Sequence, residues 1–222
     1  MEYDQLRKLE KNAHIPSGCG ISGIVNRKGN LFSGEKIITS ICLMTERGNG
    51  LGAGYAGYGI YPEFKESWCF HIMYDDIRVK ETVEAFLENR FDIVNEEPIP
   101  VKNVKTLKYI PLLHRYFVDI KNGRKEDLYS QQEYILSTVM NINKNFDGAC
   151  VFSSGKNMGI FKGVGNPEEI GEFYKIYDYK GYIWTAHNRF PTNTVGWWGG
   201  AHPFGILDWS VVHNGEISSY GI

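Results

Sequence analysis

Cys19 stands where a polar leader meets the first apolar stretch of the sequence. The eighteen residues before it, MEYDQLRKLEKNAHIPSG, follow no apolar pattern, whereas residues 19–25, CGISGIV, have the short, β-branched character of a buried strand. A cysteine thiolate is a strong nucleophile, so a thiol in this position can do covalent chemistry. The alternative is a small buried side chain, which we assign to Cys42, Cys69 and Cys150. For Cys19, position alone leaves both interpretations open.

A second polar stretch, AHNRFPTNT, follows a predicted strand end at residues 186–194. The planar guanidinium of Arg189 can give two parallel hydrogen bonds to a carboxylate, and hydroxyl and amide side chains stand beside it. The stretch therefore has the composition of a carboxylate clamp. A surface turn rich in Asn, Thr and Pro would account for the same residues equally well.

A third stretch, VVHNGE at residues 211–216, ends an apolar strand on an Asn-Gly pair. Asn-Gly is the strongest short signal for a hairpin turn. The Asn214 amide beside the unobstructed N–H of Gly215 would also form a pair of donors able to hold an oxyanion. Both interpretations fit this stretch taken alone.

The ordered set of these three stretches resembles the class II glutamine amidotransferases. The shared pattern is a Cys-Gly-Ile start, an H-x-R-F-P-T-N-T loop and an H-N-G-E strand end, and it covers residues 19–26 and 186–217. The loop is followed by His202-Pro203-Phe204, which makes the chain most similar to the glutaminase domain of glutamate synthase.

This resemblance implies an α+β fold of the N-terminal-nucleophile type, a four-layer αββα sandwich with two antiparallel sheets between helical layers. It also implies that Cys19 becomes the first residue of the mature chain. The Cys19 thiolate would attack the side-chain amide carbon of L-glutamine, with the freed α-amino group of Cys19 as general base, and water would hydrolyse the resulting thioester.

The same resemblance assigns the remaining site residues. Arg189 with Thr192 would hold the α-carboxylate of glutamine, and Asn214 with the N–H of Gly215 would form the oxyanion hole. His187, on the substrate-binding loop, and His213 are expected to support structure rather than to act as bases.

We expect residues 1–18 to be a propeptide-like leader and residues 19–222 to be the amidotransferase domain. While the leader is attached, the nitrogen of Cys19 is an amide and cannot act as a base. The family also supplies, further along the chain, a carboxylate for the substrate amino group. Since the apolar strand at 209–213 should have neighbours on both edges, we expect the domain to be incomplete at its C-terminus.

The resemblance implies a synthase domain or subunit that receives the ammonia, as in glutamate synthase. It places flavin and iron-sulfur groups in that partner and no cofactor in this domain. Other amidotransferases, which serve phosphoribosyl, sugar-phosphate or asparagine synthesis, are alternatives. So is a catalytically silent regulatory subunit of the same fold. The sequence is compatible with an oligomer.

The composition excludes several other classes of partner. A formal charge of −2, spread over mixed-sign segments, argues against nucleic acid and anionic membranes. The leader lacks the apolar centre of a signal peptide and no apolar run reaches the ~18 residues of a membrane span, so we expect a cytoplasmic protein. The four cysteines form no C-x-x-C pair and the six histidines are dispersed, so we expect no metal.

The periodicity of the rest of the chain predicts the elements that must position these residues. Helices are predicted at 34–46, at 79–87 and, from a Ser130–Glu133 capping box, through Ile142. Strands are predicted at 54–61, 68–74, 107–118, 149–153, 158–162, 182–187 and 209–213. Because the strands come in consecutive groups, they favour an α+β fold over a doubly wound parallel sheet.

One conspicuous motif is set aside. Residues 52–57, GAGYAG, match the G-x-G-x-x-G pattern of dinucleotide-binding loops. That pattern requires a strand before the glycines and a helix after them, and here a predicted helix precedes them. Close backbone packing in a glycine-rich strand is the better explanation.

Overall fold

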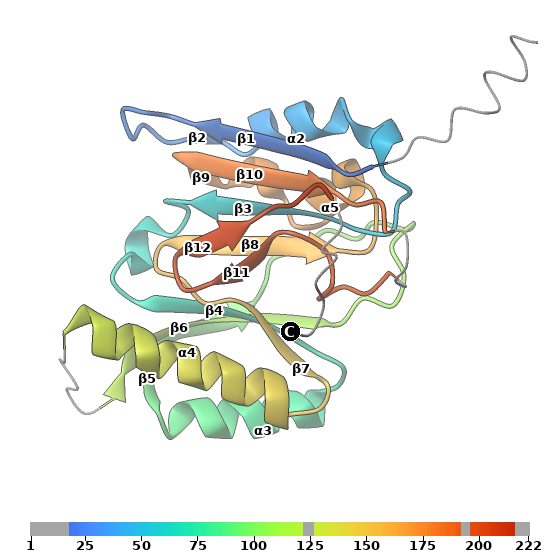
Figure 1. Cartoon of the computed structure of the whole chain (residues 1–222). Coiled ribbons are helices and arrows are strands. Elements are labelled where there is room, and N and C mark those ends of the chain that lie inside the picture. Colours follow the sequence, from blue (N-terminus) through green and yellow to red (C-terminus); the bar gives the residue numbers. More distant parts are fainter. Residues whose placement is uncertain (1–17, 122–126, 192–195, 216–222) are drawn as a thin grey trace, which may run out of the picture.

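The computed structural model describes residues 18–121, 127–191 and 196–215. In this part of the chain two four-stranded antiparallel sheets combine with four α-helices and two short strand pairs (Figure 1). The α+β class predicted from the sequence is confirmed.

The first sheet contains the strand that follows Cys19 and the strand that leads into Arg189. Its strands are, in spatial order, β1 (Gly20–Val25), β10 (Ile183–Asn188), β3 (Ala53–Tyr58) and β8 (Met158–Gly163). Two helices pack on it: α2 (Glu35–Cys42) against β1 and β10, and α5 (Pro167–Phe173) against β3 and β8. The central strand β10 is therefore hydrogen-bonded on both edges and covered by a helix.

The second sheet is assembled largely from the middle of the chain. Its strands are, in spatial order, β5 (Phe91–Pro98), β6 (Leu112–Ile120), β4 (Trp68–Tyr74) and β7 (Ala149–Ser153). Helices α3 (Ile77–Glu88) and α4 (Leu128–Asn145) pack on it, and Figure 1 shows them at the opposite end of the molecule from α2. The short pairs are β2 (Phe32–Ser33) with β9 (Lys180–Gly181), and β11 (Phe204–Ile206) with β12 (Trp209–Val211).

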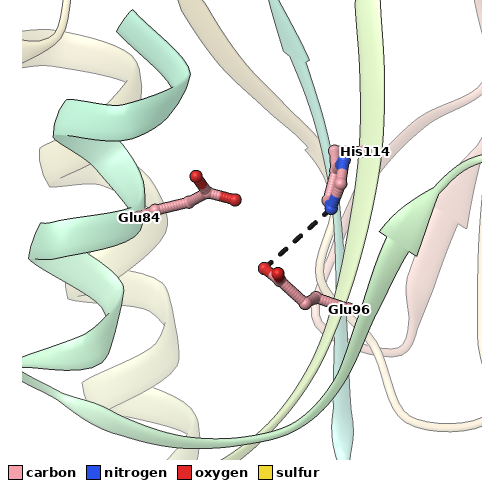
Figure 2. A group of neighbouring side chains, drawn as sticks. All are labelled: Glu84, Glu96 and His114. Carbon is pink, nitrogen blue, oxygen red and sulfur yellow. Dashed lines mark ion pairs between the residues drawn. The ribbon is translucent and has the colours of Figure 1, made fainter. Parts of the chain in front are cut away.

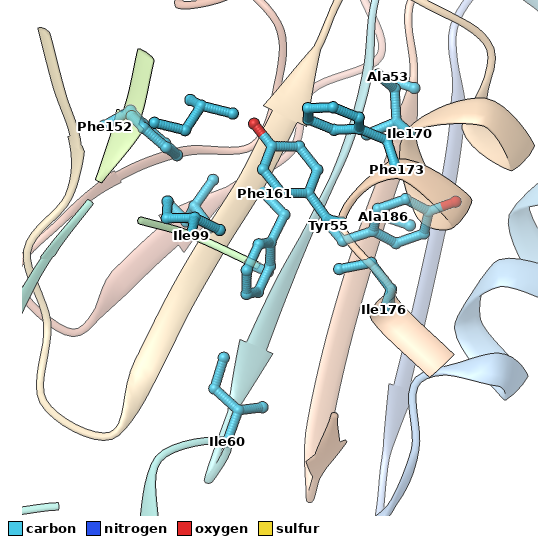
Figure 3. Packing of buried hydrophobic residues seen from close by; sticks show 14 of the residues in the cluster. Ala53, Tyr55, Ile60, Ile99, Phe152, Phe161, Ile170, Phe173, Ile176 and Ala186 are labelled. Atoms are coloured by element: carbon cyan, nitrogen blue, oxygen red, sulfur yellow. The ribbon is translucent and has the colours of Figure 1, made fainter. Parts of the chain in front are cut away.

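Two apolar clusters hold these elements together. The larger one draws buried side chains from both sheets and from α2 and α5, among them Tyr55, Phe161, Phe152 and Phe173 (Figure 3). The smaller one fills the space between the second sheet and helices α3 and α4. Burying apolar surface at about 25 cal/mol per Å² is the main stabilising contribution in such cores.

A buried polar network crosses from one sheet to the other. The His71 ring on β4 donates from Nδ1 to the carbonyl of Ile160 on β8 at 2.8 Å, and its Nε2 lies 2.9 Å from the Tyr61 hydroxyl. Arg115 on β6 donates to that hydroxyl at 3.3 Å and to Glu97 on β5 at 2.7 Å. Since a carbonyl can only accept, Nδ1 carries the proton, and burial lowers the pKa of His71 to about 3.

Most predicted elements are present, with shifted ends. Strands β4 and β7 have the predicted bounds, whereas the strand predicted at 107–118 begins only at Leu112, after Pro111. The predicted Ser130 cap is wrong: α4 begins earlier, and the Asp127 carboxylate accepts from the N–H groups of Tyr129 and Ser130. The strand predicted at 209–213 ends at Val211, and among the described residues it pairs with β11 alone.

The glycine-rich stretch at 52–57 is a central strand, as the rejection of a dinucleotide loop predicted. A Cβ on Gly54 would lie 2.4 Å from the carbonyl oxygen of His202 and 2.7 Å from that of Phe161. A Cβ on Gly57 would lie 2.6 Å from the Trp184 ring. Backbone and side chains therefore occupy the space that any larger residue would need.

We predict that Gly54→Ala destabilises the protein by about 2 kcal/mol or more, because two of the three atoms nearest to the added Cβ are backbone carbonyl oxygens that cannot rotate away. The matched control is Gly23→Ala on β1, where a Cβ would meet only the carbonyl oxygen of Trp184 at 3.9 Å. Urea unfolding of both variants measures the difference. Equal midpoints for the two variants would contradict this account of β3.

Candidate active site

The pairing of β1 with β10 brings Cys19 to the loop that carries Arg189. Gly20 pairs with Asn188 in the antiparallel register, so the residue before β1 lies beside the residues that follow β10. The backbone N–H of Phe190 donates to Cys19 Sγ at 3.3 Å. The first and second sequence motifs therefore meet at one end of the first sheet.

The third motif also lies close to Cys19. Asn214 Oδ1 lies 3.9 Å from the position that a Cβ on Gly18 would take, so the Asn214 side chain is next to the peptide bond that precedes Cys19. Arg47, which comes from the segment after α2, donates from Nε to the carbonyl oxygen of Cys19 at 3.2 Å. Cys19 is thus held by its sulfur and its carbonyl, with the Asn214 amide close by.

Asn188 positions the segment that carries Arg47. The buried Asn188 side chain donates from Nδ2 to the carbonyls of Met44 at 2.7 Å and Thr45 at 3.2 Å. A Cβ on Gly48 would lie 2.1 Å from Asn188 Oδ1, so glycine is required for this approach. Sequence analysis missed both Asn188 and Arg47, although Asn188 lies within the motif and Arg47 directly precedes Gly48.

Arg189 begins the loop after β10. Its N–H donates to the carbonyl of Gly52 at 2.8 Å, and its side chain passes over Gly52, where the Cδ atom lies 3.1 Å from the position of a Cβ. Its Nη1 lies 3.8 Å from the corresponding position at Gly200. The Arg189 side chain therefore runs between two glycine-containing segments at the end of the first sheet.

A buried lysine, which the sequence did not indicate, supports one of these segments. Lys162 at the end of β8 is 2% exposed, and its Nζ donates to the carbonyl of Gly199 at 2.8 Å. The ammonium also lies 4.5 Å from the centre of the Phe204 ring. Burial lowers the pKa of Lys162 to about 8.

His187 joins the second motif to the third. Its Nε2 lies 2.8 Å from the carbonyl oxygen of His213, the residue before Asn214. Because a carbonyl only accepts, Nε2 must carry the proton and donate it. Burial lowers the pKa of His187 to about 4, and burial followed by the proximity of His187 lowers that of His202, whose ring centre is 4.4 Å away, to about 3. Both rings are neutral at pH 7.

These contacts unite most of the predicted site residues. Cys19, His187, Arg189 and Asn214 lie at one end of the first sheet, and Gly215 follows Asn214 directly. Thr192 lies outside the described residues. The Cys19 thiol accepts a backbone N–H bond, and the Asn214 amide and the Arg47 guanidinium lie beside the adjoining backbone. A thiol in such surroundings is able to perform nucleophilic attack on an amide or ester carbon.

The family model that describes the class II glutamine amidotransferases matches residues 76–220 of this chain. This chain belongs to that family. The matched range contains the second and third motifs but not Cys19, whose place in the site rests on the contacts described above.

Several curated proteins are similar to this family member. A protein of Archaeoglobus fulgidus with no assigned function is 52% identical over 91% of this chain and 54% of its own length. A candidate glutamine amidotransferase of Methanothermobacter thermautotrophicus is 29% identical over 91% of this chain and 62% of its own. The large chain of glutamate synthase [NADPH] of Bacillus subtilis is 24% identical over 64% of this chain and 10% of its own.

The chain therefore spans little more than half the length of the first two relatives. Across the described ranges, no helix has the length and apolar character needed to cross a membrane.

We predict that His187 makes the stability of this amidotransferase domain sensitive to acid. Its folded pKa lies below the unfolded value of ~6.5, so between pH 7 and pH 5 the unfolded chain binds a proton that the folded chain does not. The free energy of unfolding should fall by about 1 to 2 kcal/mol over that interval from this residue. In His187→Gln, which keeps a donor for the His213 carbonyl, the fall should be smaller by that amount.

Urea unfolding of both proteins at pH 7 and pH 5 measures the two differences. An identical loss of stability in the parent and in His187→Gln would show that His187 titrates normally in the folded protein.

Proposed function

We propose that this chain is a glutaminase, which hydrolyses L-glutamine to glutamate and ammonia through a thioester on Cys19. The observation that carries the proposal is the convergence on Cys19: Sγ accepts from the Phe190 N–H at 3.3 Å, and the Asn214 side chain lies beside Gly18. Family membership supports glutamine as the amide that is cleaved.

In the proposed reaction, the freed α-amino group of Cys19 takes the proton of the thiol, and the thiolate attacks the side-chain amide carbon of glutamine. The oxygen of the tetrahedral intermediate is held by the Asn214 amide and the N–H of Gly215. The protonated amine then gives its proton to the leaving nitrogen, so that ammonia departs and the glutamyl thioester remains. Attack by water on the thioester releases glutamate and restores the thiol.

Glutamine is oriented by the loop after β10. Arg189 forms a forked ion pair with the substrate α-carboxylate, and Thr192 adds a hydroxyl donor. His187 stays neutral and holds the strand end that carries Asn214, which is a positioning role. Lys162 performs a similar task for the Gly199 segment, next to Arg189.

The ammonia passes to a synthase domain or subunit. Similarity to the large chain of a glutamate synthase favours an acceptor of that kind, with the flavin and iron-sulfur groups in the partner and none in this domain. The two sheets with their helices would then stack in the αββα order of the N-terminal-nucleophile hydrolases. There are two alternatives. A silent subunit of the same fold is tested by the activity experiment that follows, and a glutaminase that serves a different synthase is tested by identifying the acceptor of the ammonia.

We predict that glutamine-hydrolysing protein begins at Cys19, because the proposed base is the amine freed when residues 1–18 are removed. Intact-mass analysis of the active protein tests this. Cys19→Ala should lower glutaminase activity at least about 1,000-fold. Cys42→Ala is the matched control and should remain active, because burial, and then the charge of Glu168, raise the pKa of the Cys42 thiol.

Full activity in a chain that still starts at Met1, or in Cys19→Ala, would show that the proposed mechanism is wrong. A processed chain without any glutaminase activity would instead favour the silent subunit.

We predict that Arg189→Lys raises the KM for glutamine at least about tenfold with a smaller change in kcat, because lysine keeps the charge but loses the two-pronged geometry. Arg27→Lys, on an exposed turn, is the control and should behave like the parent. Steady-state kinetics with glutamine and with a simple amide lacking the α-carboxylate measures the effect. Comparable hydrolysis of both substrates by the parent would refute this role for Arg189.

A further inference from the structure

A second group of chemically active side chains lies on the other sheet, between α3 and the β5–β6 pair. Glu84 comes from α3, Glu96 from β5 and His114 from β6, and Figure 2 shows the three side chains directed toward one another. One ligand atom from each lies within 4.8 Å of the other two. These residues are too far apart in the sequence to form a motif, which is why sequence analysis led us to expect no metal.

The imidazole of His114 is directed into this group without a hydrogen bond. The residue is 8% exposed, and its Nε2 is buried with no hydrogen-bond partner among the described residues. The nearest carboxylate oxygen, Oε2 of Glu96, is 4.0 Å away. Burial, and then the charge of Lys80, lower the pKa of His114 to about 4, so the ring is neutral at pH 7 and forms no ion pair. A buried polar atom left unsatisfied is costly, which points to a missing ligand.

The Glu84 carboxylate is held in place by its neighbours. Its Oε1 accepts from the Tyr116 hydroxyl at 2.9 Å and contacts the Lys80 ammonium, and Tyr74 donates to Tyr116 at 3.1 Å. Burial opposes ionisation, but the bonds from Lys80 and Tyr116 bring the pKa of Glu84 below its usual value. This chain of hydroxyls orients the carboxylate as outer-shell groups orient metal ligands.

Glu96 completes the group from the solvent side. Its side chain is 51% exposed. Burial, and then the charge of Glu84, raise its pKa. Lys80 neutralises one of the two carboxylates, so the group keeps a net negative charge. A cation between Glu84 and Glu96 would relieve their repulsion.

We propose that Glu84, Glu96 and His114 bind a divalent transition-metal ion, for which Zn²⁺ is the best match. One imidazole nitrogen and two carboxylate oxygens are a ligand set that Zn²⁺ accepts, whereas Mg²⁺ prefers oxygen ligands alone. Tetrahedral ligands at ~2.0 Å from the metal lie ~3.3 Å apart. Ligand atoms that are now up to 4.8 Å apart must therefore approach each other by at most about 1.5 Å, a movement that the two side chains of a pair can share. The ion would tie α3 to the β5–β6 pair and stabilise the second sheet.

The experiment uses the full chain with Cys19→Ala, which removes this partly exposed thiol as a competing ligand. Four proteins are compared: this parent, Glu96→Gln, His114→Gln, and the control Glu81→Gln, an exposed glutamate of α3 outside the group. Zn²⁺ affinity is measured by competition with a chromophoric chelator, and thermal unfolding is followed with and without saturating Zn²⁺.

We expect the parent and Glu81→Gln to bind one Zn²⁺ with micromolar or tighter affinity, undisturbed by millimolar Mg²⁺, and to melt roughly 5 °C higher in its presence. Glu96→Gln and His114→Gln should bind at least tenfold more weakly and lose the shift. No Zn²⁺ binding by the parent, or equal binding by all four proteins, would overturn the proposal. If His114→Gln does not fold, the half-exposed and isosteric Glu96→Gln variant decides alone.

Discussion

The structure depends above all on the close antiparallel pairing of β10 with β1 on one edge and β3 on the other. This pairing is possible only where β3 presents hydrogen atoms in place of side chains, since the Trp184 ring occupies the space beside Gly57 and the His202 carbonyl that beside Gly54. Helix α2 then covers the face of β1 and β10. Because a shift of one residue turns every side chain to the opposite face, the register of β10 also fixes the chemistry at its end.

Four consecutive residues at that end carry out four different tasks. His187 reaches the strand end before Asn214, Asn188 holds the segment with Arg47, Arg189 enters the loop, and the Phe190 N–H meets the Cys19 sulfur. Three remote parts of the chain are thereby aligned at the end of one strand, two of the contacts coming from its last residues and two from the first residues of the loop that follows. A site anchored on a rigid strand is held more accurately than one built on loops alone. The buried lysine at the end of β8 adds a fourth anchor through the Gly199 carbonyl.

The parts of this architecture that the sequence predicted are those set by local signals. Strands β4 and β7 are largely apolar runs and were predicted with their observed bounds. Short motifs singled out Cys19, Arg189 and Asn214, which the fold brings to one end of the first sheet. Helix α5 was missed because seven residues are too few for periodicity to show. Arg47, Asn188 and Lys162 were missed for a different reason: each acts through a contact with a distant carbonyl, and no residue type or spacing reports such a partner.

The pairing of β1 with β10 also affects how the chain folds during its synthesis on the ribosome. Gly20 pairs with Asn188, which is far along the chain. Strand β1 therefore emerges from the ribosome long before β10 has been synthesised. At typical synthesis rates of 5–20 residues per second the delay is roughly 10 to 30 s, during which the edges of β1 are unpaired. The second sheet and helices α3 and α4, encoded between the two strands, can form during that time. Cys19 thus reaches the residues that follow β10 only after the middle of the chain has been synthesised.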